Sequence, residues 1–151
     1  MIGVISDTHG LLRPEALAAL QGSELILHAG DIGPSEILET LRDIAPVRVV
    51  RGNCDQGPWA RALPETEVVT VGGRDIYMIH DIGQLDLSPA TAGFLAVVYG
   101  HSHQPKIEER DGVLYLNPGS AGRRRFTLPV SVALLHLGAR RATAEIIELD
   151  V

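Results

Sequence analysis

The chain has 151 residues, and its 13 basic and 19 acidic side chains give a net charge of −6, which argues against a nucleic-acid-binding surface built on bulk positive charge. Hydrophobic residues make up 45% and charged residues 21% of the chain, so we expect one globular domain over residues 1–151 rather than a disordered protein. The single cysteine excludes an internal disulfide. The sequence shows no basic start typical of a signal peptide, and no apolar stretch approaches the roughly 18 residues of a membrane span. A cytoplasmic protein is therefore expected.

Apolar runs that each end on a polar residue or a glycine predict five strands along the chain. The runs cover Ile2–Ile5, Leu25–Leu27, Val47–Val50, Ile76–Ile79 and Leu95–Tyr99. Apolar residues at helical spacing over Arg13–Leu20 and Pro34–Ile44 separate the first three runs, and Pro14 suits the first turn of a helix. This alternation predicts a parallel sheet with right-handed crossovers, of the doubly wound kind.

The second half of the chain predicts antiparallel hairpins. Gly72-Gly73 separates Val68–Val71 from Ile76–Ile79, Asp111-Gly112 separates Lys106–Glu109 from Val113–Leu116, and Gly138 lies between Val130–Leu137 and Ala142–Leu149. Glycine adopts the positive φ angles that tight turns need. The two halves together predict a mixed α/β fold with two sheets.

Side chains that bind metals follow the carboxyl ends of the predicted strands. They occur in Asp7-Thr8-His9, Gly30-Asp31, Gly52-Asn53-Cys54-Asp55, His80 and Gly100-His101-Ser102-His103. Loops at this edge of an open α/β sheet converge, so we expect these groups to lie together. Each segment alone is a weak signal, because a histidine after a strand is more often packed or solvated than a ligand. The full set suits divalent cations and is too large for one tetrahedral ion, so two ions are expected.

In this order, the same motifs resemble those of the calcineurin-like metallophosphoesterase superfamily. Gly52-Asn53-Cys54-Asp55 and the later Asn117-Pro118-Gly119-Ser120 are most similar to its small bacterial and archaeal phosphodiesterase branch, which is related to the Vps29 subunit of retromer. The resemblance covers nearly the whole chain. It implies an α/β fold, a four-layer α/β/β/α sandwich of two mixed sheets, with a binuclear metal centre between the sheets.

The resemblance also implies a role for each motif residue. One metal would be held by Asp7, His9, Asp31 and His103, and the other by Asp31, Asn53, His80 and His101, with Asp31 bridging. The implied activity is hydrolysis of a small phosphate ester by a metal-bridging hydroxide, with Asn53, Asp31 and His101 as catalytic residues. The implied cofactors are two divalent ions, Mn²⁺ first, with Ni²⁺, Fe²⁺ or Zn²⁺ as substitutes. The alternative is a metal-binding interaction scaffold that resembles Vps29, with little or no catalysis.

Three further positions bear on substrate contacts. Cys54 stands where many superfamily members carry a histidine; a thiol transfers protons poorly, so we expect Cys54 to contact substrate or to be a small buried thiol rather than a nucleophile. Asp81 follows His80 where the branch usually has glycine, and it is expected to be a loop carboxylate or an orienting acceptor. Arg123 is the first candidate to draw a phosphate toward the metals, with a solvated loop as the alternative.

Two of the six histidines, His28 and His136, are expected to be structural, because each lies in or at the end of a predicted strand. The other four are the expected metal ligands. Apart from a small phosphate-ester substrate, neither nucleic acid nor membrane is expected as a partner, and the sequence is compatible with a homo-oligomer.

Overall fold

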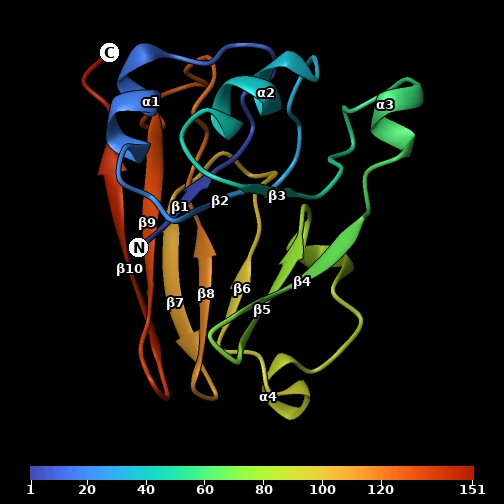
Figure 1. Ribbon diagram of the computed structural model, residues 1–151, viewed down its shortest axis with the longest axis vertical. Coiled ribbons are helices and arrows are strands. Elements are labelled where there is room, and N and C mark those ends of the chain that lie inside the picture. The colour runs from blue at the N-terminus through green and yellow to red at the C-terminus, as the bar shows by residue number, and fades with distance from the viewer.

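The computed structural model describes all residues from Met1 to Val151 as two five-stranded mixed sheets, shown in Figure 1. The first has the strand order β10-β9-β1-β2-β3 and the second β4-β5-β6-β8-β7. The ten strands of the two sheets are β1 (Ile2–Ile5), β2 (Leu25–His28), β3 (Val47–Val49), β4 (Thr66–Val71), β5 (Arg74–Ile79), β6 (Ala96–Val98), β7 (Lys106–Arg110), β8 (Val113–Asn117), β9 (Ser131–Leu137) and β10 (Ala142–Glu148). Its helices are α1 (Pro14–Leu20), α2 (Glu36–Arg42), α3 (Pro58–Arg61), the 3₁₀ turn η1 (Ile82–Gln84) and α4 (Pro89–Ala92). The expected fold class is confirmed.

The first sheet is built from consecutive strand–helix–strand units, with β1, β2 and β3 parallel. Both crossover helices cover its outer face, where Leu20 of α1 and Leu41 of α2 pack with Ile5 and Ile26. The doubly wound arrangement expected from the sequence is therefore wrong. Right-handed crossovers that step in the same direction along a sheet leave their helices on one face, which frees the other face for the second sheet.

The main core lies between the two sheets. Val4 and Leu27 of the first sheet belong to the same buried cluster as Met78, Val98 and Leu116 of the second. β5, β6 and β8 are parallel, so the buried strands of both sheets read as continuous apolar runs. The three expected hairpins are present as the antiparallel pairs β4–β5, β7–β8 and β9–β10.

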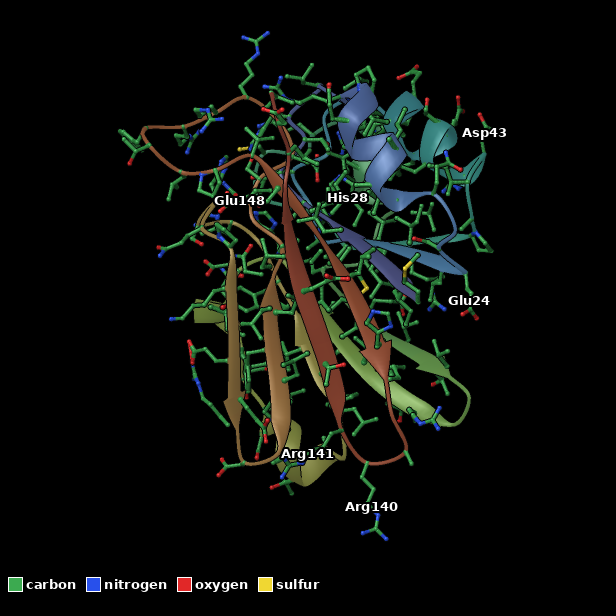
Figure 2. The ribbon with its side chains drawn as sticks, turned by 90° about the vertical axis from the view of Figure 1, so that its left-hand side faces the viewer. Glu24, His28, Asp43, Arg140, Arg141 and Glu148 are labelled. Carbon is green, nitrogen blue, oxygen red and sulfur yellow. The ribbon has the colours of Figure 1, made fainter.

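The outer layer over the second sheet is thin. Tyr77, Tyr99 and Tyr115 form a small cluster there, against which Phe94 and Leu85 pack from the segments around α4 and η1. None of the helices is long and apolar enough to cross a membrane. Figure 2 shows the turn of the β9–β10 hairpin, with Arg140 and Arg141, at the opposite end of the molecule from His28. The polar loops lie at the end of the molecule that contains His28.

Candidate metal centre

Loops that follow strands of both sheets meet at one end of the molecule, toward which β5 and β8 point in Figure 1. The first sheet supplies Asp7 and His9 after β1, Asp31 after β2 and Asn53 after β3, and the second supplies His80 after β5 and His101 and His103 after β6. Hydrogen bonds join the sheets here; for example, His80 Nδ1 lies 2.6 Å from the Ala29 carbonyl, and the His101 N–H donates to Asp7 Oδ2 at 3.1 Å. The structure thus brings all seven expected ligands together.

Asp7 is a fully buried carboxylate with one oxygen that lacks a donor. Its Oδ2 accepts hydrogen bonds from Ser6 Oγ and the His101 N–H, but its Oδ1 has no hydrogen-bond partner. Oδ1 instead faces the Nε2 atoms of His103, His9 and His80 at 3.5, 3.7 and 4.0 Å. A buried ionised oxygen without a donor is costly, so these four groups fit a cation placed among them.

Asp31 lies between two groups of possible ligands. Its Oδ2 is 3.2 Å from His80 Nε2 and 3.6 Å from His9 Nε2, while its Oδ1 accepts a hydrogen bond from the Cys54 N–H at 2.8 Å. Beyond His80, Asn53 Oδ1 lies 3.1 Å from His80 Nε2 and 3.2 Å from His101 Nδ1. A carboxylate in this place is suited to bridge two ions.

The possible ligand atoms form two compact sets, each with all its atoms within 4.8 Å of one another: Asp7, His9 and His103, and Asp31, His80 and His101. These sets correspond to the two expected sites, with Asn53 beside the second. A third, overlapping set joins the Cys54 thiol to His9 and Asp31. Carboxylate, imidazole and amide oxygen together suit Mn²⁺, Fe²⁺, Ni²⁺ or Zn²⁺.

Burial and neighbouring charges shift the pKa values of several groups of the cluster, in different directions. The neighbouring Asp7 carboxylate raises the pKa of His9. At His80, burial lowers the pKa, but the interaction with Asp31 and the charge of Asp7 outweigh it, so the pKa of His80 is also raised. Burial would raise the pKa of Asp31, but its interactions with His80 and the Cys54 N–H lower it. Burial lowers the pKa of His103. Cations would replace the protons that the carboxylates draw onto His9 and His80.

His80 is oriented by its own hydrogen bonds. The Ala29 carbonyl can only accept a hydrogen bond, so His80 Nδ1 carries a proton and donates it to this carbonyl, while Nε2 faces Asp31 and Asn53. Without a metal, Nε2 needs a proton to satisfy these two oxygens, which agrees with the raised pKa of His80. With its proton on Nδ1, neutral His80 presents a lone pair at Nε2.

The backbone of the centre is strained. Seven residues other than glycine have positive φ angles, and five of them are expected ligands: Asp7, His9, Asp31, His101 and His103. Such angles cost energy for residues with a Cβ and gather at functional sites, where they aim side chains that an ordinary strand end would not. Glycines make room between the loops, since a Cβ on Gly52 would overlap the Asp31 carboxylate. No motif in the sequence indicates this backbone strain.

Further side chains support the centre without joining it. The Asp55 carboxylate accepts hydrogen bonds from the N–H groups of Asp31, Ile32 and Gly52 at 3.0, 2.8 and 2.9 Å, which fastens two ligand-bearing loops to each other. Asn117 Nδ2 donates to the Gly100 carbonyl at 3.0 Å. Ser120 Oγ donates to the Asp7 carbonyl at 3.0 Å. The motifs at positions 52–55 and 117–120 contain these residues, but in the sequence they indicate the family resemblance and not these supporting roles.

His28 is structural, as expected. It is fully buried, its Nδ1 accepts the Gly30 N–H at 3.1 Å, and its Nε2 lies 3.1 Å from Thr8 Oγ1, which donates to the Ile32 carbonyl. Burial lowers the pKa of His28 to about 4, and a proton on Nδ1 would break the bond from Gly30. His136 is an exposed residue of β9 and belongs to neither ligand set.

A cleft of about 610 Å³ opens beside the centre, with Asn53, His80 and His101 at one end. Cys54 is exposed at the same loop, so the buried-thiol interpretation is wrong. Partial burial of its sulfur and the nearby charge of Asp31 raise the pKa of the Cys54 thiol. Asp81 is a loop carboxylate: its Oδ1 accepts the Gly83 N–H at 2.9 Å, while its Oδ2 lies 4.0 Å from His101 Nε2, too far for a hydrogen bond.

The structure does not place Arg123, the arginine expected to contact the substrate, at the cleft. Arg123 is exposed, makes no hydrogen bond or ion pair, and does not line the cleft. Within the same run, the charge of Arg125 contributes to the pKa values of His9 and His103, so Arg125 lies closer to the centre. The arginines of the cleft are Arg51 and Arg61, which sequence analysis missed because neither lies in a motif.

Comparison with known proteins agrees with this geometry. Residues 1–140 match the model of the calcineurin-like phosphoesterase superfamily domain. A probable metallophosphoesterase of Methanothermobacter thermautotrophicus is 41% identical over 97% of this chain and 91% of its own length, and phosphodiesterase YfcE of Escherichia coli is 26% identical over 86% and 84%. Zinc-bound Vps29 of Entamoeba histolytica, 24% identical, shares the fold with a TM-score of 0.74 over 97% of this chain and 98% of its own. This chain therefore belongs to the calcineurin-like phosphoesterase superfamily.

Proposed function

We propose that this protein is a phosphodiesterase that hydrolyses small phosphate esters with two divalent cations, of which Mn²⁺ suits the mixed donor set best. The observation that carries the proposal is the buried Asp7 Oδ1, which has no donor and faces three imidazole nitrogens beside Asp31. The likeness to proteins named metallophosphoesterase and phosphodiesterase supports it. Because both sheets supply ligands, residues 1–151 would act as one domain.

In this proposal, one cation is held by Asp7, His9, Asp31 and His103, and the other by Asp31, Asn53, His80 and His101. When bound, the two cations supply an ionised water and positive charge beside the phosphoryl group. The chain's part is to hold neutral imidazoles with a lone pair toward the cations, as the bond from His80 Nδ1–H to Ala29 does for His80 Nε2.

Side chains at the exposed edge would orient the substrate. Asn53 and His101 lie beside the cleft, where they would contact the phosphoryl oxygens and offset their charge. The raised pKa of Cys54 keeps its thiol protonated at neutral pH, so Cys54 would touch the substrate without attacking phosphorus. Near the other ligand set, Arg125 is better placed than Arg123 to attract an anion.

Hydrolysis of bis(p-nitrophenyl) phosphate tests the proposal directly. We expect activity with added Mn²⁺ that Asp31→Ala lowers by more than roughly a hundredfold, because even residues that only orient ligands cost about 10- to 100-fold. Asp43→Ala, at the exposed end of α2, is the matched control and keeps the wild-type rate. Equal rates for wild type and Asp31→Ala would place any activity elsewhere.

The fold shared with Vps29 keeps one other function in view, a metal-binding interaction scaffold. The same assay separates the two functions when metal content is measured beside it. A scaffold binds metal through Asp31 and hydrolyses no ester, whereas the proposed enzyme loses metal and activity together in Asp31→Ala.

A further inference from the structure

The cleft beside the centre has an unusual lining. Its walls come from the connection between β3 and β4, which includes α3 at the edge of the molecule in Figure 1, and from the end of β5 with η1. Of the 13 residues that line its 610 Å³, only Ile79 is hydrophobic, and none is Phe, Tyr or Trp. Small-molecule sites of this size are mostly apolar and aromatic, so this cleft is suited to a polar group.

The carboxylates of the cleft all have partners in the protein. Asp55 accepts loop N–H groups, Asp81 accepts the Gly83 N–H, and Glu65 pairs with Arg51 at 2.6 Å. Arg61, at the end of α3, forms no hydrogen bond through its guanidinium and no ion pair. Arg61 is therefore the one arginine of the cleft without an ion-pair partner, in a lining that holds two arginines and three carboxylates.

The neutral side chains add donors beside that cation. The amides of Gln56 and Gln84 line the cleft and make no hydrogen bond within the protein. Arg51 stays in place through Glu65 and presents its remaining N–H groups. Guanidinium and amide donors gathered around an open space bind the oxygens of an anion, since a guanidinium matches phosphate and carboxylate groups with two parallel hydrogen bonds.

We infer that the cleft binds a second anionic group, a phosphate or a carboxylate, carried by one substituent of the phosphate ester, with Arg61 as its main contact. The inference rests on the proposed function, in which the ester itself would bind beside Asn53, His80 and His101, three residues that also line the cleft. It defines the substrate class as small phosphodiesters with an additional anionic group. Ile79 is the only hydrophobic residue of the lining that an acyl chain or an unsubstituted aryl group could contact.

Three p-nitrophenyl phosphodiesters test this class, because they share a leaving group and differ only in the other alcohol: ethyl, 2-carboxyethyl and 2-phosphoethyl. With Mn²⁺ present, we expect kcat/KM for at least one anionic ester to exceed that for the ethyl ester by roughly tenfold, the effect of one charge-assisted hydrogen-bonded pair. The better of the two anionic esters identifies the group. Arg61→Gln should remove most of this preference through KM, and Arg61→Lys should keep part of it.

Arg42→Gln is the matched control, because Arg42 is also the exposed last residue of a helix and lies outside the cleft. It should keep the full preference. If all three esters are hydrolysed with equal kcat/KM, or if the preference survives in Arg61→Gln, this inference is overturned and the proposed function stands. If the wild type with Mn²⁺ hydrolyses none of them, the proposed function fails, and this inference with it.

Discussion

Asp55 belongs to neither ligand set, yet its carboxylate holds the Asp31 loop. Bonds from Asp31, Ile32 and Gly52 keep Asp31 at a φ of 56°, an angle that costs about 1–3 kcal/mol. Asp55→Asn turns one acceptor oxygen into a donor that faces an N–H. We expect the free energy of unfolding to fall by roughly 1–3 kcal/mol and metal affinity by about tenfold, measured by urea denaturation and metal titration.

Asp43→Asn provides the comparison for Asp55, because Asp43 ends α2 at the surface. It should change neither quantity. A stable Asp55→Asn protein with wild-type metal affinity would show that the loop holds its shape without the carboxylate.

Cys54 allows a second test of a single residue, because it is the only thiol in the chain. Partial burial and the Asp31 charge raise its pKa, so less thiolate is present at a given pH. In EDTA at pH 8, we expect iodoacetamide to alkylate folded protein several-fold more slowly than protein unfolded in urea, although Cys54 is exposed. Asp31→Asn should speed alkylation of the folded protein; an unchanged rate would mean that charge does not control this thiol.

At the scale of elements, the end of β2 joins the core to the centre. His28 ends this strand as a neutral, fully buried ring that accepts the Gly30 N–H, and the next turn carries Asp31. Figure 2 shows His28 close to the helices that cover the first sheet. Protonation of His28 would therefore disturb the strand and the ligand loop together.

This predicts a pH dependence of stability. The pKa of His28 is about 4 when folded and near its ordinary value of 6.5 when unfolded, so the unfolded chain binds the extra proton between these values. The contribution is present above pH 6.5 and is lost as pH falls toward 4, by at most about 3 kcal/mol. Chemical denaturation in EDTA should show a steeper loss for wild type than for His28→Gln over this range. Parallel curves would contradict the assignment.

The sequence predicted the buried strands better than the short helices. Continuous apolar runs located β1, β2, β3, β5 and β6, because buried parallel strands need apolar residues on both faces. The one-turn helices α3 and α4 were missed, since a four-residue segment has no periodicity to detect.

In the candidate site, the metal ligands could likewise be predicted from the sequence better than the substrate contacts. Ligand types at strand ends could be recognised from residue identity and order, because topology brings those ends together. The residues that contact substrate could not be recognised in this way. Arg123 is the arginine next to a motif, whereas Arg61 lines the cleft because it lies on a helix that the sequence did not predict. Positive φ angles at Asp7 and Asp31 are likewise set by packing around them.

At the scale of the whole molecule, the centre lies where the two sheets meet. Asp7 and Asp31 extend from the first sheet, and His80 and His103 from the second, so each ligand set contains residues of both. Bound cations would tie the sheets together at this end and relieve repulsion between buried carboxylates. The hydrophobic core between the sheets does not depend on metal, so the protein should fold without it and be less stable.

Metal removal should therefore lower Tm without unfolding the protein at room temperature. At a free Mn²⁺ concentration of 100 Kd, binding adds about 2.7 kcal/mol, which for a chain of this size raises Tm by roughly 5–10 °C over the value in EDTA. The gain should shrink from pH 8 to pH 5.5, because the raised pKa values of His9 and His80 let protons compete with metal as pH falls. Asp31→Ala should lose the gain, whereas His136→Ala, altered at an exposed histidine outside both ligand sets, should keep it. An equal Mn²⁺-dependent rise in Tm for Asp31→Ala would show that the stabilising cation binds somewhere other than between the sheets.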